Sequence, residues 1–85
     1  MEKTLEKIRE IITKPMQDME IIVESVTWEK ESNQYYLKIE LDKVNGIDLD
    51  TIVEATRVIN PILDKYDLID QEYTLEITSK ERGEE

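Results

Sequence analysis

The sequence predicts an α+β domain of two layers, in which a three-stranded sheet carries two helices on one face, in the chain order α-β-β-α-β. Three observations lead to this prediction. Two segments have apolar residues spaced by three and four positions, as in helices with one buried side. Others alternate apolar and polar residues, as in strands with one solvated face. At 85 residues, the chain has room for one small core and no second domain.

The first helix is predicted over residues 3–18. Its apolar stripe consists of Leu5, Ile8, Ile12, Met16 and Met19, widened by Ile11. Pro15 lies within this pattern and cannot donate a helical hydrogen bond, yet the stripe continues beyond it. We therefore expect a kink at this point rather than the end of the helix.

The next two segments predict an antiparallel hairpin with one solvated face. Ile21 and Val23 lie on the opposite alternation phase from Val26 and Trp28, so the first strand must begin late or contain a bulge. The polar run EKESNQ, residues 29–34, supplies the turn. The second strand alternates regularly, with Tyr35, Leu37, Ile39 and Leu41 on one face and Tyr36, Lys38, Glu40 and Asp42 on the other.

The second helix follows the Asn45–Gly46 pair, which suits positive φ and marks the exit from the hairpin. Asp48 is the predicted N-cap and Asp50 lies near the positive end of the helix dipole. Thr51 and Glu54 form a competing capping box. The buried stripe is predicted to be Ile52, Ala55, Ile59, Leu63 and Tyr66, with a bend near Ile59 caused by Pro61. In the last strand, Tyr73, Leu75 and Ile77 face inward and Thr74, Glu76 and Thr78 face outward.

Composition excludes most enzymatic chemistry. The chain has neither Cys nor His, which removes disulfides, thiolates, imidazole bases and the commonest zinc ligands. With 21 acidic and 11 basic residues, its net charge of −10 repels a phosphate backbone. No apolar run approaches the length of a membrane span, and no signal-peptide core precedes the first helix. We therefore expect a cytoplasmic protein that is not an enzyme and needs no cofactor.

Candidate reactive groups have simpler structural explanations. Asp64, Asp67 and Asp70 are spaced by three, without the turn or ligand density of a calcium loop, so no metal site is predicted. Thr56 and Ser79 lack a nearby base. The aromatic residues Trp28, Tyr35 and Tyr36 could form a base-stacking platform, but packing is favoured for Trp28, and Tyr36 alone projects to the polar face as a minor contact candidate.

Four segments, taken in order, resemble the N-terminal domain of the RimP family of bacterial ribosome maturation factors. They are IITKPMQDMEIIVESV (11–26), NGIDLDTI (45–52), INPILDKYDLI (59–69) and YTLEITS (73–79). The chain departs from the family at Glu20, where the family has glycine. It departs again at residues 80–85, where the family continues into a barrel-like second domain. We expect a domain over residues 1–79 and a disordered charged tail over 80–85, either in a truncated chain or in a natural single-domain form.

The resemblance implies a non-catalytic assembly factor that binds the small ribosomal subunit, chiefly through a basic ribosomal protein, the twelfth of that subunit. An acidic domain suits such a partner. The candidate contact residues are Glu40, Asp42, Asp64, Thr74 and Glu76. We expect a monomer with no direct binding to nucleic acid or membrane. The alternative is an acidic scaffold module that forms homo-oligomers by pairing an open sheet edge with its own copy. RNA binding in the manner of KH domains is a distant third, because neither glycine lies in a GXXG loop.

Overall fold

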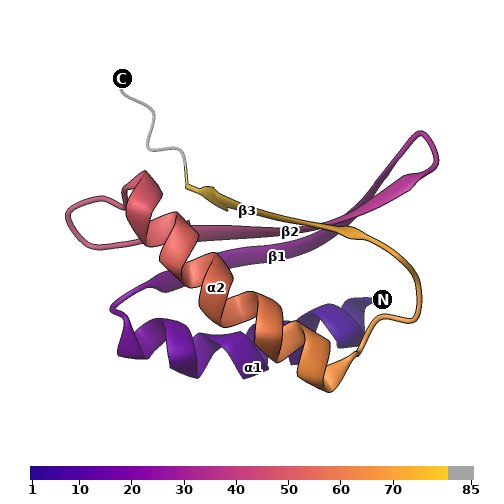
Figure 1. Ribbon diagram of the computed structural model, residues 1–85, viewed down its shortest axis with the longest axis horizontal. Helices are drawn as coiled ribbons and strands as arrows, with labels where there is room; N and C mark the ends of the chain where they lie inside the picture. Colours follow the sequence, from indigo (N-terminus) through magenta and orange to yellow (C-terminus); the bar gives the residue numbers. More distant parts are fainter. Residues whose placement is uncertain (81–85) are drawn as a thin grey trace.

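The computed structural model describes residues 1–80, so of the charged tail predicted over 80–85 only Lys80 is described. The elements are α1 (Glu2–Asp18), β1 (Ile22–Glu31), β2 (Gln34–Asp42), α2 (Leu49–Tyr66) and β3 (Thr74–Ser79). The strand order is β1-β2-β3; β1 and β2 are antiparallel, whereas β2 and β3 are parallel. Both helices lie on the same side of the sheet (Figure 1). The predicted two-layer α+β fold is therefore confirmed.

The core lies between the helices and the central strand. Leu37, Ile39 and Leu41 of β2 are fully buried, as are Ile12 of α1 and Ile59 of α2. The parallel sense of β3 requires a long crossover from β2, and α2 makes this crossover while covering the sheet. Within residues 1–80, no helix is both long and apolar enough to cross a membrane.

A β-bulge reconciles the two alternation phases of β1. The register with β2 shifts between Val23 and Ser25, as the sequence predicts. Because of this shift, Ile21 and Val23 are buried and Val26 and Trp28 also pack against the core. The predicted polar turn was too long, since β1 continues to Glu31 and pairs it with Gln34. A two-residue loop remains, and its first residue, Ser32, has a φ of 56°, the positive value that two-residue hairpin turns of types I′ and II′ have at this position.

The end of α1 is a Schellman motif built around Glu20. The backbone N–H of Ile21 donates to the carbonyl of Met16 at 2.8 Å, and that of Glu20 donates to Gln17 at 2.9 Å. Glu20 itself has a φ of 62°, in the left-handed region. Met16 and Ile21 are both buried, which supplies the apolar contact that accompanies this motif. Glu20 is therefore a strained residue, because its backbone conformation favours glycine.

Replacing Glu20 with glycine is expected to raise the free energy of unfolding by about 1 kcal/mol, because glycine adopts positive φ without the steric cost that a Cβ brings. Urea denaturation of the wild type and the variant measures the difference. Glu20→Ala is the control, since it removes the same charge but keeps the Cβ. If the alanine and glycine variants raised the free energy of unfolding equally, the effect would come from the lost charge and not from backbone conformation.

Asp48 caps α2, as predicted. Its Oδ1 accepts the backbone N–H of Thr51 at 2.9 Å, and its own backbone is extended. The helix begins at Leu49, so Thr51 and Glu54 do not form its N-terminal capping box. Both α1 and α2 continue through their prolines, Pro15 and Pro61.

The buried stripe of α2 ends earlier than predicted. Ala55, Ile59 and Leu63 are buried, but Tyr66 is 49% exposed, so its assignment to the core was wrong. Tyr66 is the last residue of the helix, which ends as Asp67 adopts a left-handed conformation. Ile69, in the segment that follows, is buried instead.

Asp48→Ala is expected to lower the midpoint of thermal unfolding by a few degrees at neutral pH, because Thr51 loses its acceptor. Hydrogen bonds from the Thr51 side chain and backbone lower the pKa of Asp48 below its ordinary 3.8. The stabilisation is therefore complete above pH 3.8 and is lost as the pH falls through the lower folded-state pKa. Calorimetry from neutral to acid pH should show the wild type and variant converging. Asp50→Ala is the control, because Asp50 carries a charge in the first turn of α2 but does not make the capping hydrogen bond. An equally large fall in the unfolding midpoint for this control would contradict the capping explanation.

Candidate functional site

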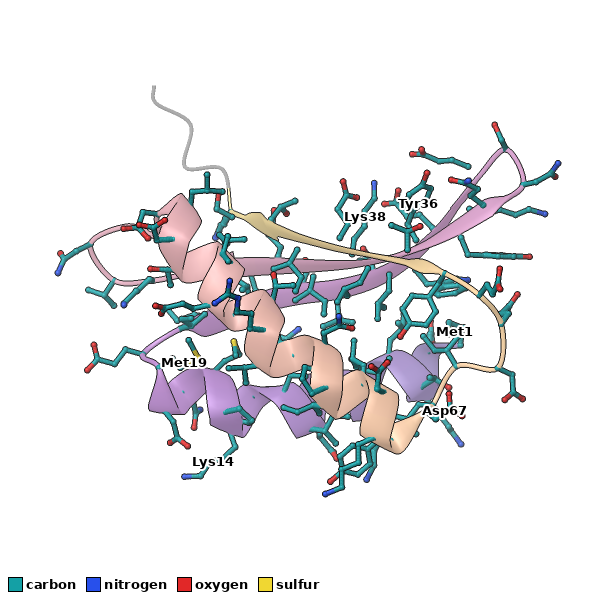
Figure 2. All side chains as sticks on the ribbon, in the orientation of Figure 1. Met1, Lys14, Met19, Tyr36, Lys38 and Asp67 are labelled. Carbon is teal, nitrogen blue, oxygen red and sulfur yellow. The ribbon has the colours of Figure 1, made fainter. Side chains whose placement is uncertain are left out.

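The sheet face that points away from the helices carries most of the predicted contact residues. We call this surface the open face. It is defined by Ser25, Thr27 and Glu29 of β1, Tyr36, Lys38 and Glu40 of β2, and Thr74, Glu76 and Thr78 of β3. The labelled Tyr36 and Lys38 side chains project from this side of the sheet (Figure 2). The structure therefore brings Glu40, Thr74 and Glu76 together on one surface.

Lys38 occupies the middle of the open face and neutralises part of it. Its Nζ lies 2.9 Å from Oε1 of Glu29 on β1 and 3.8 Å from Oε1 of Glu76 on β3. The hydrogen bond to Glu29 is the main cause that raises the pKa of Lys38, and Glu76 adds to it. Glu40 is farther along β2, where its carboxylate accepts from Ser25 Oγ at 3.5 Å. Of the predicted contacts on the open face, Glu76 is therefore already engaged with a cation.

Asp42 does not lie on a solvated surface, and that prediction was wrong. It ends β2 opposite Ile22 and is 8% exposed. Its Oδ1 accepts the backbone N–H of Lys43 at 2.8 Å. The alternation that placed it outward is correct for the strand, but at the strand end the carboxylate turns back to the chain. Asp42 thus has a local structural role in leading the chain out of the sheet.

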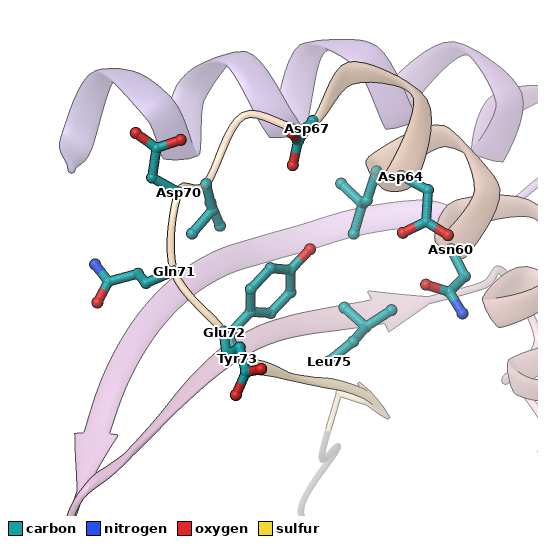
Figure 3. A pocket seen from close by; sticks show the side chains of 10 residues that line it. Asn60, Asp64, Asp67, Asp70, Gln71, Glu72, Tyr73 and Leu75 are labelled. Carbon is teal, nitrogen blue, oxygen red and sulfur yellow. The ribbon is translucent and has the colours of Figure 1, made fainter.

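Asp64 lies on the other side of the sheet, beside a groove of about 650 Å³. The groove lies between the C-terminal half of α2 and the segment that leads into β3 (Figure 3). Four acidic residues, Asp64, Asp67, Asp70 and Glu72, line it, and no lysine or arginine of the described residues does. We call this feature the acidic groove. No group of three or more potential ligands within residues 1–80 is arranged to hold a metal ion.

Local backbone and packing shape the acidic groove. Asp67 ends α2 with a φ of 48°, and its N–H donates to the carbonyl of Leu63 at 2.8 Å. Buried Ile69 anchors the following segment to the core. The ring of Tyr73 meets Trp28 edge-on, with 5.8 Å between ring centroids. These features place Asp64 and Asp67 beside the segment that carries Asp70 and Glu72, so that all four residues line one groove.

Tyr73 reports on the electrostatics of the acidic groove. Burial raises the pKa of its phenol above the ordinary 10.0, and the negative charges of Asp64 and Asp67 raise it further. Asp64→Asn is therefore expected to lower this pKa, as measured by NMR titration of the ring carbon that bears the hydroxyl. Glu54→Gln, on the exposed N-terminal half of the same helix, should leave it unchanged. A Tyr73 pKa that is insensitive to Asp64→Asn would contradict the groove geometry.

The aromatic residues of the hairpin pack against one another. Trp28 stacks on Tyr35 with 5.2 Å between centroids and an interplanar angle of 18°, and the Nζ of Lys30 lies 5.5 Å from the Tyr35 centroid. Packing of Trp28, as favoured from the sequence, is therefore observed. Tyr36 projects to the open face, and its hydroxyl donates to Gln34 at 2.8 Å.

Sequence reasoning missed the acidic groove as a surface. It considered Asp67 and Asp70 only as metal ligands and did not consider Glu72. The available signal was the density of acidic residues between the end of the second helix and the start of the last strand. That density becomes a groove because the chain turns back at Asp67 toward the sheet.

Comparison with protein families agrees with this architecture. The model of the RimP N-terminal domain matches residues 11–80, from within α1 through the end of β3. The match includes every strand and the whole of α2, and it covers both the open face and the acidic groove. The chain therefore belongs to the RimP N-terminal domain family, a family of ribosome maturation factors.

Proposed function

We propose that this domain acts in the cytoplasm, in maturation of the small ribosomal subunit, by docking on a basic ribosomal protein without catalysing a reaction. Membership of the RimP N-terminal domain family supports the ribosomal context. The choice of partner rests on the acidic groove, which four acidic residues line. Lysine and arginine side chains of a basic protein would complement this charge.

The proposed contacts come from two surfaces. Asp64 belongs to the acidic groove, whereas Glu40, Thr74 and Glu76 belong to the open face. Asp42 is left out because it is buried. A protein is favoured over RNA as the direct partner, because a net charge of −10 repels phosphates at long range.

A pull-down against purified small-subunit proteins tests the proposal. At about 0.05 M salt, the immobilised domain is expected to capture one basic protein, and capture is expected to fall steeply at about 0.5 M, where exposed charges are screened. Failure to capture any of these proteins at the lower salt concentration would refute the proposal. Salt-insensitive capture would refute its electrostatic basis.

Self-association through a sheet edge is the alternative function. The outer edge of β3, which no strand within residues 1–80 pairs, favours it, but two copies that each carry a charge of −10 repel one another. We therefore propose a monomer. Light scattering across a range of protein concentrations distinguishes the two, since a concentration-dependent mass would favour the scaffold module.

A further inference from the structure

Among the described residues 1–80, none pairs with the backbone groups on the outer edge of β3. β3 is paired with β2 on one side and, within residues 1–80, has no strand on the other. The N–H of Lys80 donates to the carbonyl of Leu41 at 2.7 Å, so the backbone N–H of Lys80 faces β2. Since N–H and C=O point to opposite edges at successive residues of a strand, those of Leu75, Ile77 and Ser79 point to the free edge. These groups can bond an additional strand.

The other edge of the sheet is less suited to pairing. β1 is interrupted there by the bulge between Val23 and Ser25. In addition, Nη2 of Arg9 on α1 donates to the carbonyl of Val23 at 2.8 Å, so this edge acceptor is already used. Bulges and covering groups are devices that protect edge strands from pairing. β3 has neither device within its regular stretch from Thr74 to Ser79.

Acidic side chains lie on both sides of the free edge. On the helix side, Leu75 and Tyr73 line the acidic groove together with Asp64 of α2 and Asp67, the residue that ends this helix (Figure 3). On the opposite side, Glu76 projects from the open face. A strand added to β3 has its side chains alternately on these two sides. The acidic groove extends along α2 as far as Asn60. Arg57, one turn earlier on this helix, is positively charged and marks the end of the acidic surface toward the N-terminus of α2.

We propose that β3 is the docking site for an extended basic segment of a partner protein, which adds as a fourth strand and places lysine or arginine side chains in the acidic groove. This inference rests on the proposed function in that the partner is a basic protein, and it adds the mode of binding. Backbone hydrogen bonds to the free edge supply affinity, and the groove carboxylates select positive side chains. A second copy of this chain does not fit, because it would bring Glu76 and its own acidic groove to the same edge.

Hydrogen exchange followed by NMR on the whole chain tests this mode. The probe is a capped peptide of about ten residues with alternating lysine and valine, and the control is the same peptide N-methylated at every residue, so that neither of its edges can donate backbone hydrogen bonds. The first peptide is expected to slow exchange of the Leu75, Ile77 and Ser79 amides by about tenfold or more at saturation. The Glu76 and Thr78 amides already face β2 and should change little. The N-methylated peptide carries the same charge but cannot complete the ladder, so it should protect none of them.

Three results would overturn the inference. They are failure of the unmodified peptide to bind at low salt, binding without the alternating protection, and equal protection by both peptides. The outcome is separable from that of the ribosomal pull-down. Capture of a basic ribosomal protein without protection of these amides would leave the proposed function standing and remove the strand-addition mode. Alternating protection by the peptide without ribosomal capture would do the reverse.

Discussion

Ile39→Ala is expected to lower the free energy of unfolding by about 2–5 kcal/mol, the largest effect of any substitution considered for this domain. Ile39 is fully buried in the central strand, between Val26 of β1 and Ile77 of β3. Truncation removes buried apolar surface and leaves a cavity that packed neighbours only partly fill. Domains of this size are stable by only about 5–15 kcal/mol, so the variant loses a large share of its stability.

Urea denaturation followed by Trp28 fluorescence and by circular dichroism measures this loss. Val44→Ala is the matched control, because it deletes aliphatic carbons from a loop residue that is 72% exposed. The control is expected to change stability by no more than about 0.5 kcal/mol. A loss below about 1 kcal/mol for Ile39→Ala would contradict the central position of this side chain.

Reversing two charges in the acidic groove is expected to have the second-largest effect. The double variant Asp64→Lys, Asp67→Lys should weaken binding of the captured basic ribosomal protein by about tenfold or more at low salt, because like charges then face each other across the interface. Titration calorimetry or surface plasmon resonance measures the change. The loss should shrink as salt screens the added repulsion.

The control for this variant must make the same change in net charge elsewhere. Asp18→Lys with Glu54→Lys does so, since Asp18 ends α1 and Glu54 is on the exposed N-terminal half of α2. Neither residue lines the acidic groove. Circular dichroism of both double variants checks that the fold is retained. Equal loss of affinity in the two would show that overall charge, and not the groove, governs binding.

The features that the sequence predicts correctly depend on local chemistry. The Asp48 cap follows from a short acceptor placed before an apolar helical stripe, and the structure has this bond. The β1 bulge follows from two alternation phases in one strand. In each case neighbours in the chain determine the geometry.

The features that the sequence does not predict depend on residues distant in the chain. Asp42 continues the polar alternation of its strand, and its burial arises at the strand end beside Ile22. Tyr66 continues a helical stripe, but the buried position beyond it is taken by Ile69 after the helix ends. The acidic groove combines α2 with the segment before β3, so it exists only after β3 has paired with β2.

The parallel pairing of β3 has a consequence for the order of assembly. The β1–β2 hairpin can close through a two-residue loop, whereas β3 reaches β2 only after all of α2 has been traversed. Closing the longer loop costs more chain entropy, and non-local pairings form late. β3 is therefore the strand whose ordering completes the domain. A molecule that binds the outer edge of β3 would therefore stabilise the completed sheet against the loss of this strand.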